Sequence, residues 1–323
     1  MPKPGQRYRF PKLKAPRISA HSPDTTERQA FERAYQSLQG LVVGDCFGEQ
    51  FFGPVVEKIQ QIIEHNLPEG PWRYTDDTEM ALSMVDTLDR HGRIVQDELA
   101  QAFAWRFNER RGYGGGAWQL LRSIRAGLYW KDGASAMFRG TGSYGNGGAM
   151  RVAPLGAFFA TDLDRAQEEA RLSAEVTHQH PEGIIGAEAT ALAAALRWQE
   201  GENPSRSPQE LMTIIAERIP MSDTRIGIEQ AAAMPPDVRV DKVTAVLGAG
   251  SQVSAQDTVP FCLWCAFHNL DSYEEALWKT VSGLGDRDTT CAIVGGILAA
   301  HPSTPPPTHW QEQAEDFSLA TPK

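Results

Sequence analysis

The sequence is poor in cysteine and has no long apolar run. Its 323 residues contain only four cysteines, Cys46, Cys262, Cys265 and Cys291, which are too few for a fold built on disulfides. No stretch of about 18 or more apolar residues is present, and no apolar segment follows the basic N-terminus. We therefore expect a cytoplasmic protein that has no membrane role.

Basic residues are the scarcer charge, 31 against 41 acidic residues, for a formal net charge of −10. An acidic surface repels phosphate backbones, which argues against a nucleic-acid coat role. The basic residues are also unevenly distributed, because residues 1–23 contain six of them and no acid. The rest of the chain then carries 25 basic and 41 acidic residues, so an acidic body is joined to a basic arm.

The two ends of the chain differ from its middle. Residues 1–24 are basic, contain several prolines and show no sustained hydrophobic period, which predicts an extended arm. This arm is either a solvated tail or a docking segment for an acidic surface. Residues 302–323 begin with a proline-rich stretch and are predicted to form a C-terminal tail. Residues 25–301 contain no repeat and no long linker, so we expect a single domain there.

The hydrophobic pattern of this domain is helical throughout. Apolar residues recur at i, i+3, i+4 spacing from Phe31 to Val42 and again from Met80 to Leu88. Four further segments share the pattern and have alanine-rich faces that suit close helix packing: residues 162–178, 184–199, 258–268 and 288–300. Because no convincing alternating strand is present, we predict an all-α fold.

Two acidic clusters stand at predicted helix starts, Thr75-Asp76-Asp77-Thr78-Glu79 and Asp286-Arg287-Asp288-Thr289-Thr290. Each cluster alone can be explained as an N-terminal cap, through Asp76 with Glu79 or through Asp288. A cap needs only one acid, however, and adjacent carboxylates repel each other unless a cation lies between them. Taken together, two clusters of oxygen donors favour one shared Mg²⁺ or Mn²⁺ site.

Two other segments contain residue types that are typical of ligand binding. The loop Gly142-Ser143-Tyr144-Gly145-Asn146-Gly147-Gly148 is dense in glycine, so its backbone N–H groups can approach an anionic ligand closely. It can equally be a flexible loop. His178, which lies in Thr177-His178-Gln179-His180-Pro181, is either a structural histidine or a polar contact to a substrate.

Five motifs, in this order, resemble the ADP-ribosylglycohydrolase family, which includes the dinitrogenase-reductase-activating glycohydrolases. They are Gly44-Asp45-Cys46-Phe47-Gly48, Thr75-Asp76-Asp77-Thr78, Gly145-Asn146-Gly147-Gly148-Ala149-Met150-Arg151, Thr177-His178 and Asp286-Arg287-Asp288-Thr289. The resemblance covers about residues 38–300. It implies an all-α, orthogonal multi-helix bundle that holds two Mg²⁺ or Mn²⁺ ions.

The resemblance also implies roles for individual residues. The metal ligands carry over to Thr75, Asp76, Asp77, Asp286, Asp288 and Thr289. The positions that hold ADP-ribose carry over to Ser143, Tyr144, Gly145, Asn146, Gly147 and His178, with Asn146 beside the ribose. The pyrophosphate would be held by loop N–H groups together with His178 or Arg151.

The implied activity is metal-dependent removal of ADP-ribose from modified proteins, in the first place from ADP-ribosylarginine. The ribose diol is a good ligand for two hard cations, which orient the sugar and a water molecule. Cleavage builds positive charge on the sugar ring, so a nearby carboxylate can stabilise that charge and accept the water proton. Asp77, Asp288 and Glu49 are the predicted catalytic carboxylates.

Two positions depart from the family's pattern. The family usually has a glutamate four residues after the second glycine of the G-D-x-x-G motif, where this chain has Phe52. Glu49, three residues earlier, would replace that glutamate if the segment is rearranged. Arg287 stands where a threonine is common, and its side chain is expected to point away from the ions.

Three functional hypotheses follow. The first is an ADP-ribosylarginine hydrolase that acts as an immunity protein, with residues 1–24 docked on an ADP-ribosyltransferase toxin. The second is an ADP-ribose-binding or crystallin-like structural protein whose catalysis is impaired by the change at Phe52. The third is a hydrolase of serine-linked or other ADP-ribosyl adducts, because contacts to a leaving group come from variable loops.

Overall fold

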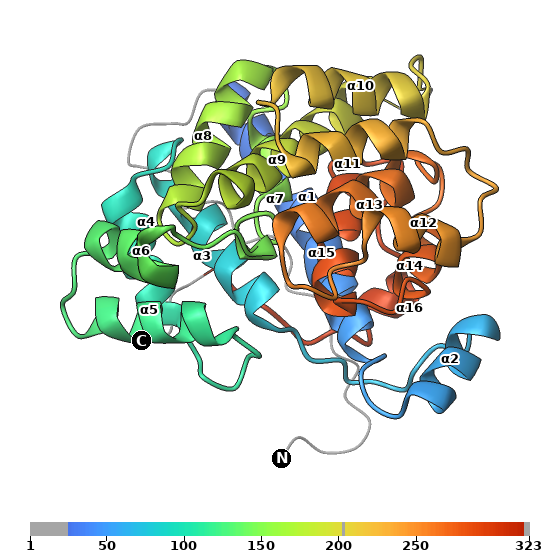
Figure 1. Cartoon of the computed structure of the whole chain (residues 1–323), viewed down its shortest axis with the longest axis horizontal. Coiled ribbons are helices and arrows are strands. Elements are labelled where there is room, and N and C mark those ends of the chain that lie inside the picture. Colours follow the sequence, from blue (N-terminus) through green and yellow to red (C-terminus); the bar gives the residue numbers. More distant parts are fainter. Residues whose placement is uncertain (1–24, 202–203, 320–323) are drawn as a thin grey trace.

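The computed structural model describes residues 25–201 and 204–319, and these residues form a helical body (Figure 1). The described ranges contain two isolated β-bridges, Trp72 with Ala314 and Gly145 with Ser254, but no strand. The predicted all-α class is confirmed. The predicted basic arm, residues 1–24, lies outside the described residues.

The helices in chain order are α1 (Thr25–Glu49), α2 (Val55–Ile63), α3 (Asp76–His91), α4 (Gln96–Arg106), α5 (Gly115–Arg125), α6 (Trp130–Gly140), η1 (Asn146–Gly148), α7 (Ala153–Phe158), α8 (Leu163–Glu175), α9 (Pro181–Glu200), α10 (Pro208–Arg218), α11 (Asp223–Ala232), α12 (Val240–Leu247), α13 (Ala255–Phe267), α14 (Tyr273–Val281), α15 (Arg287–Leu298) and α16 (Thr308–Gln311). All six predicted helical segments are present, as α1, α3, α8, α9, α13 and α15. Helix α9 begins three residues before the predicted start because Pro181 suits its first turn.

The centre of the fold is the antiparallel pair α1 and α15 (Figure 1). Gly40, Gly44 and Gly48 recur every four residues along one face of α1. A Cβ atom on Gly44 would lie 2.2 Å from the carbonyl oxygen of Cys291, and one on Gly48 would lie 2.1 Å from that of Arg287. Only glycine permits this approach, which brings the end of α1 directly against the start of α15.

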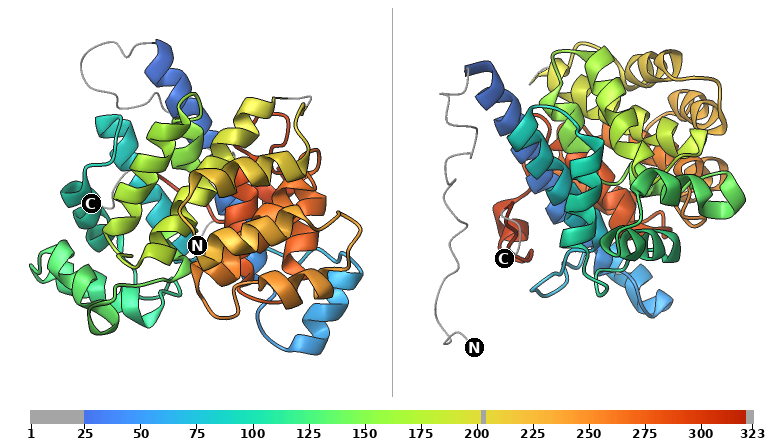
Figure 2. Two further views of the ribbon diagram at one scale, coloured as in Figure 1. Left: turned by 45° about the horizontal axis from the view of Figure 1, so that its top comes forward. Right: turned by 90° about the vertical axis from the view of Figure 1, so that its left-hand side faces the viewer.

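The C-terminal segment packs against the same region (Figure 2). Trp310 of α16 is fully buried, and its ring centroid lies 4.3 Å from that of Phe47 on α1. The N–H of Trp72 donates to the carbonyl of Gln313 at 2.7 Å, and the N–H of Glu315 donates to the carbonyl of Trp72 at 2.8 Å. The described part of the predicted tail therefore contributes to the packed core.

The cysteines also belong to the core. All four are buried and none forms a disulfide. Cys262 and Cys265 lie on α13 and are fully buried, so this C-x-x-C pair fills the interior as two small apolar side chains. Among the described helices, none is both long and apolar enough to cross a membrane.

Candidate metal centre

The first acidic cluster lies at the start of α3. Thr75 is the N-cap, and its hydroxyl accepts the N–H of Asp77 at 3.4 Å. The N–H of Asp76 donates instead to the carbonyl of Arg111 at 2.7 Å. Because the threonine is the cap, the capping explanation of the two aspartates is wrong, and both carboxylates are available for another role.

The second cluster lies at the start of α15. Asp286 is the N-cap residue and Asp288 falls within the first turn, so the cap that we considered at Asp288 is also wrong. One oxygen of Asp286, Oδ2, accepts a hydrogen bond from Nδ2 of Asn146 at 2.7 Å. Thr289 is buried beside Asp288 in the same turn.

Three carboxylates from three helices converge at this point. One oxygen each from Asp45 of α1, Asp77 of α3 and Asp288 of α15 lie within 4.8 Å of one another. Oδ1 of Asp77 and Oδ1 of Asp288 are buried and have no hydrogen-bond partner in the described structure. Buried carboxylate oxygens without a donor are costly, so their convergence makes this cluster a candidate site for a cation.

Sequence reasoning quoted Asp45 within a motif but gave it no role. It accepts hydrogen bonds from the backbone N–H groups of Thr75 and Thr78 at 2.9 and 3.1 Å, and from both threonine hydroxyls. Asp45 thereby joins α1 to the first turn of α3 and orients it toward α15. The available signal was a single acid within the apolar run of residues 41–47, where an unpaired charge needs a reason.

The charges of this cluster are not balanced by basic residues. Burial, followed by the charge of Asp45, raises the pKa of Asp76 to about 8. Burial and a neighbouring carboxylate raise the pKa values of Asp77 and Asp288 well above the usual range. No ion pair in the described ranges includes any of the five aspartates, Asp45, Asp76, Asp77, Asp286 and Asp288. All-oxygen donors with unbalanced negative charge fit a hard divalent cation.

Glu49 lies one helical turn beyond Asp45, at the last residue of α1. It is partly buried, and burial together with the charges of Asp45 and Asp286 raises its pKa. Its carboxylate is thus within the electrostatic reach of Asp45 and of the second acidic cluster. The position at the end of α1 therefore supplies an acid next to the centre.

The two positions that depart from the family's pattern are in contact with each other. The guanidinium carbon of Arg287 lies 5.0 Å from the ring centroid of Phe52. Its Nη1 donates to the carbonyl of Phe51 at 2.8 Å, and its Nη2 donates to that of Leu284 at 2.9 Å. Arg287 makes no ion pair with its aspartate neighbours, and Phe52 offers no oxygen to a cation.

The glycine-rich loop is attached to the acidic centre through Asn146. Besides bonding to Asp286, Nδ2 of Asn146 donates to Oγ1 of Thr258 at 3.2 Å. The hydroxyl of Ser143 accepts the N–H of Gly145 at 3.2 Å, which shapes the turn. Tyr144 is 46% exposed and stacks on Phe138, with the ring centroids 6.3 Å apart. The loop therefore places Asn146 beside Asp286 and also carries an exposed aromatic residue.

His178 lies in the segment just before α9 and faces this loop. A Cβ atom on Gly147 would lie 3.1 Å from its Nε2, and one on Gly145 would lie 3.3 Å away. Burial and the charge of Arg151 lower the pKa of His178 to about 3, so the ring is neutral. Arg151 itself is fully buried and bonds to Ser173 and Thr177. His178, and not Arg151, is thus the group that borders the loop.

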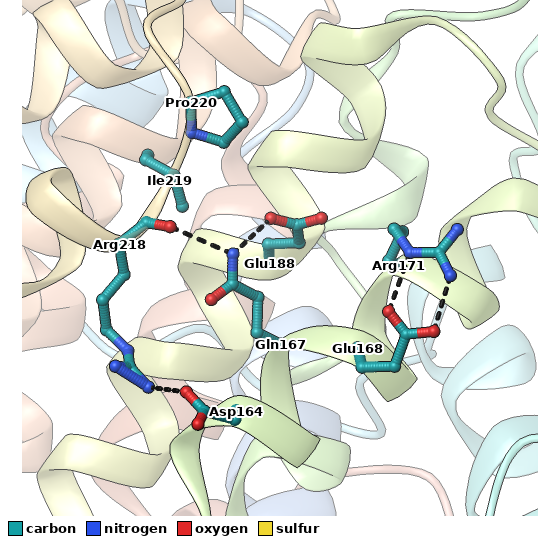
Figure 3. A pocket seen from close by; sticks show the side chains of 8 residues that line it. All are labelled: Asp164, Gln167, Glu168, Arg171, Glu188, Arg218, Ile219 and Pro220. Atoms are coloured by element: carbon teal, nitrogen blue, oxygen red, sulfur yellow. Dashed lines mark hydrogen bonds and ion pairs between the residues drawn. The ribbon is translucent and has the colours of Figure 1, made fainter.

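A second acidic region surrounds a cavity of about 490 Å³ between α8, α9 and the end of α10 (Figure 3). None of the residues that line it is a predicted site residue. Each of its three acids has a partner: Asp164 with Arg218, Glu168 with Arg171 and Glu188 with Gln167. Each of these acids has an arginine or an amide donor, so within the described structure this cavity lacks the unpartnered buried carboxylate oxygens of the metal centre.

The fold and site together define an all-helical protein with an acidic centre suited to hard cations. Comparison with known proteins then identifies the protein family. The ADP-ribosylglycohydrolase family profile matches residues 26–320. The chain belongs to the ADP-ribosylglycohydrolase family.

Individual relatives agree with this assignment. The chain is 28% identical to ADP-ribosylhydrolase ARH3 of Danio rerio over 88% of this chain and 86% of that protein. It is 27% identical to ADP-ribosylhydrolase ARH3 of Homo sapiens over 87% and 88% of the two chains. A partial match, 27% identical over 49% of this chain and 45% of the relative, is to ADP-ribosylarginine hydrolase Tri1 of Pseudomonas putida.

A solved structure described as an ADP-ribosylglycohydrolase-related protein complex has the same fold. Its TM-score is 0.62 at 23% sequence identity, and the match covers 88% of this chain and 92% of that one. The expected bundle is therefore confirmed at the level of the fold.

Proposed function

We propose that this protein is a metal-dependent hydrolase that removes ADP-ribose from modified proteins. The observation that carries the proposal is the convergence of Asp45, Asp77 and Asp288, with bare buried oxygens on the last two. Family membership supplies the ADP-ribosyl substrate class. Two divalent cations, Mg²⁺ or Mn²⁺, would be held by Thr75, Asp76, Asp77, Asp286, Asp288 and Thr289.

Bound cations would supply Lewis-acid activation of a water molecule and a fixed position for the ribose diol. The chain's own residues do the rest. Asp77, which is buried, and Asp288, which is half-buried with a buried Oδ1, hold the centre from α3 and α15. Glu49 is the group that we assign to accepting the water proton, because its raised pKa brings it nearer to neutrality. The clustered carboxylates also stabilise the positive charge that develops on the sugar ring.

The glycine-rich loop is the proposed ADP-ribose site. Ser143 and Gly147 would bring backbone N–H groups to the pyrophosphate, the N–H of Gly145 would hold the turn through Ser143, and His178 would contribute a polar contact. Asn146, bonded to Asp286, would lie where the ribose meets the metal centre. Tyr144, with its stacked neighbour Phe138, offers an exposed π-face for the adenine base.

We assign arginine as the preferred linkage, supported by the partial similarity to a protein named ADP-ribosylarginine hydrolase. A second candidate is a hydrolase of serine-linked or other adducts. The contact between Phe52 and Arg287 favours keeping it, because both positions depart from the family's usual residues at the edge of the centre. Because neither Phe52 nor Arg287 has a carboxylate, this pair would change which leaving group binds at the edge of the metal centre.

The test is release of ADP-ribose from arginine-linked and serine-linked protein substrates, with Mg²⁺ and after chelation. We expect metal-dependent release that Asp77→Ala abolishes and that Glu49→Gln lowers by about 100-fold or more. Glu188→Gln, a buried acid beside the other cavity, should retain wild-type activity. Release that survives both chelation and Asp77→Ala would contradict the mechanism. Binding of ADP-ribose without any release would establish the non-enzymatic hypothesis instead.

The basic arm, residues 1–24, has a separate proposed role as the docking segment of an immunity protein on an ADP-ribosyltransferase toxin. Its six basic residues lie outside the residues that we assign to hydrolysis. Deletion of residues 1–24 should weaken toxin binding and leave ADP-ribose release unchanged. Unchanged toxin affinity would rule out docking through the arm.

A further inference from the structure

We propose that Arg151 and Thr177 hold His178 in the tautomer that carries its proton on Nε2, and so present a neutral N–H donor to the glycine-rich loop. Arg151 and Thr177 are positioning residues in this arrangement. The assignment of the tautomer depends only on the hydrogen bonds described below. The identity of the acceptor, a phosphate or ribose oxygen of ADP-ribose, rests on the proposed function.

The direction of the hydrogen bonds follows from the chemistry of the three side chains. A guanidinium group can only donate, and Nη2 of Arg151 lies 3.0 Å from Oγ1 of Thr177. Oγ1 therefore accepts from Arg151. The other hydrogen-bond partner of this hydroxyl within the described residues is Nδ1 of His178, at 2.7 Å. Because the hydroxyl has one proton to donate and Nδ1 is the acceptor within reach among the described residues, we infer that the hydroxyl donates to Nδ1.

The state of the imidazole ring then follows. A neutral imidazole carries one proton, and a nitrogen that accepts a hydrogen bond cannot carry it. Nδ1 accepts from Thr177, so the proton is on Nε2. Burial and the charge of Arg151 lower the pKa of His178 to about 3, which keeps the ring neutral at every pH near neutrality.

Arg151 is itself locked in place. It is fully buried, and its guanidinium lies over the ring of Phe103, with Cζ 4.5 Å from the centroid. Nη2 also donates to the carbonyl of Ser173 at 2.9 Å. No ion pair holds this arginine among the described residues. Burying a guanidinium without a carboxylate partner costs free energy. We infer that Arg151 is retained because it orients the hydroxyl of Thr177.

Nε2 of His178 lies beside Gly145 and Gly147, whose lack of side chains leaves space next to the ring. A Cβ atom at Gly147 would lie 2.9 Å from Cε1 and 3.1 Å from Nε2 of the ring. No hydrogen bond to Nε2 is formed within the described ranges. The ring thus offers an N–H to whatever lies in the loop. A neutral donor of this kind binds an anionic oxygen without titrating near neutral pH.

The direct test is the ¹⁵N spectrum of the histidine rings of the full-length protein without ligand, with His178 assigned by its loss in His178→Asn. We expect a protonated Nε2 and an unprotonated Nδ1. The reverse pattern, a protonated Nδ1, would overturn the proposal. So would a ring that is protonated on both nitrogens at pH 7.

Variants at Thr177 test the positioning role. Thr177→Val removes the donor to Nδ1 and should shift both nitrogen signals toward a tautomer mixture, while Thr177→Ser should retain the wild-type pattern. Thr190→Val is the matched control, because Thr190 is also buried and its hydroxyl has no hydrogen-bond partner in the described structure. Unchanged nitrogen signals in Thr177→Val would contradict the role of the hydroxyl.

Calorimetric titration with ADP-ribose connects the tautomer to binding. Loss of one oriented hydrogen bond corresponds to about a 5- to 10-fold weaker affinity in Thr177→Val, with Thr177→Ser close to wild type. Equal affinities of Thr177→Val and wild type would contradict the donor role of His178 toward this ligand. If the wild type does not bind ADP-ribose while its Nε2 is protonated, the proposed function fails and the tautomer assignment stands.

Discussion

The metal centre and the cavity between α8, α9 and α10 are both lined with acids, but they differ in how their charges are satisfied. At the centre, Oδ1 of Asp77 and Oδ1 of Asp288 are buried, and within the described structure these atoms have no hydrogen-bond partner and their carboxylates form no ion pair. At the cavity, Asp164 and Glu168 are ion-paired with arginines, and Glu188 accepts a hydrogen bond from Gln167 (Figure 3). Acid content alone therefore does not distinguish a metal site from a charged surface hollow.

The physical difference lies in desolvation. A buried carboxylate without a donor or a counter-charge is strongly destabilised, and the protein retains it only where something else binds. Exposed ion pairs such as that of Asp164, whose side chain is 91% exposed, contribute little and need no ligand. Unpaired burial, and not the number of acids, is the criterion that points to the centre.

The largest expected difference between the two regions is in metal affinity, when Asp45, the carboxylate that orients the first turn of α3, is substituted. In Asp45→Asn, an NH2 group, which donates and cannot accept, replaces one of the two carboxylate oxygens that accept from Thr75 and Thr78, so the first turn of α3 loses part of its orientation. We expect metal affinity to fall by about 10- to 100-fold, measured by Mn²⁺ titration calorimetry. The matched variant Glu188→Gln in the cavity should bind Mn²⁺ as the wild type does. Equal losses of Mn²⁺ affinity in both variants would contradict the proposed difference between the metal centre and the cavity.

A smaller effect is expected from pH on the metal-free protein. Burial raises the pKa of Asp76 to about 8 in the folded state, above its ordinary value of 3.8. A raised folded pKa means that the stabilising contribution is present at low pH and is lost as the pH rises toward 8. We expect the free energy of unfolding to fall by about 1 kcal/mol per pH unit between about pH 5 and 8, measured by urea unfolding with a chelator.

Two comparisons assign this pH effect to the centre. Asp76→Asn should reduce the slope, to which Asp77 and Asp288 still contribute, and Asp164→Asn, a change at the cavity, should leave it as in the wild type. Added Mn²⁺ should stabilise the wild type increasingly as the pH rises, because cations bind the ionised carboxylates. A metal-free protein whose stability rises with pH across this range would contradict the described electrostatics.

Most of the fold could be predicted from the sequence because its helices carry clear apolar periods. The faces around Leu38 on α1 and Met84 on α3 are buried as their spacing predicts. The close contact of α1 with α15 was not predicted. It depends on Gly40, Gly44 and Gly48, whose four-residue spacing has a meaning only when the opposing helix is known. The burial of Trp310 was likewise missed, because its neighbours in sequence are prolines and polar residues.

The site was predictable in part. The two acidic clusters stood out because adjacent aspartates at helix starts exceed what a cap requires. The third carboxylate, Asp45, did not, because it contacts Thr75 and Thr78 through tertiary packing alone. The same holds for the link from Arg151 through Thr177 to His178, which joins the end of η1 and its following turn to the segment before α9. The individual metal and substrate roles remain predictions.

The most direct test is Mn²⁺ binding to the full-length wild type and to Asp77→Asn. Titration calorimetry measures how many ions bind, and electron paramagnetic resonance measures whether they are magnetically coupled. We expect the wild type to bind two Mn²⁺ ions that are magnetically coupled. Asp77→Asn should lose that coupling, since this substitution neutralises a carboxylate at the meeting point of the three helices. A wild type that binds no Mn²⁺, or an Asp77→Asn protein that binds two coupled ions as before, would contradict the proposed metal centre.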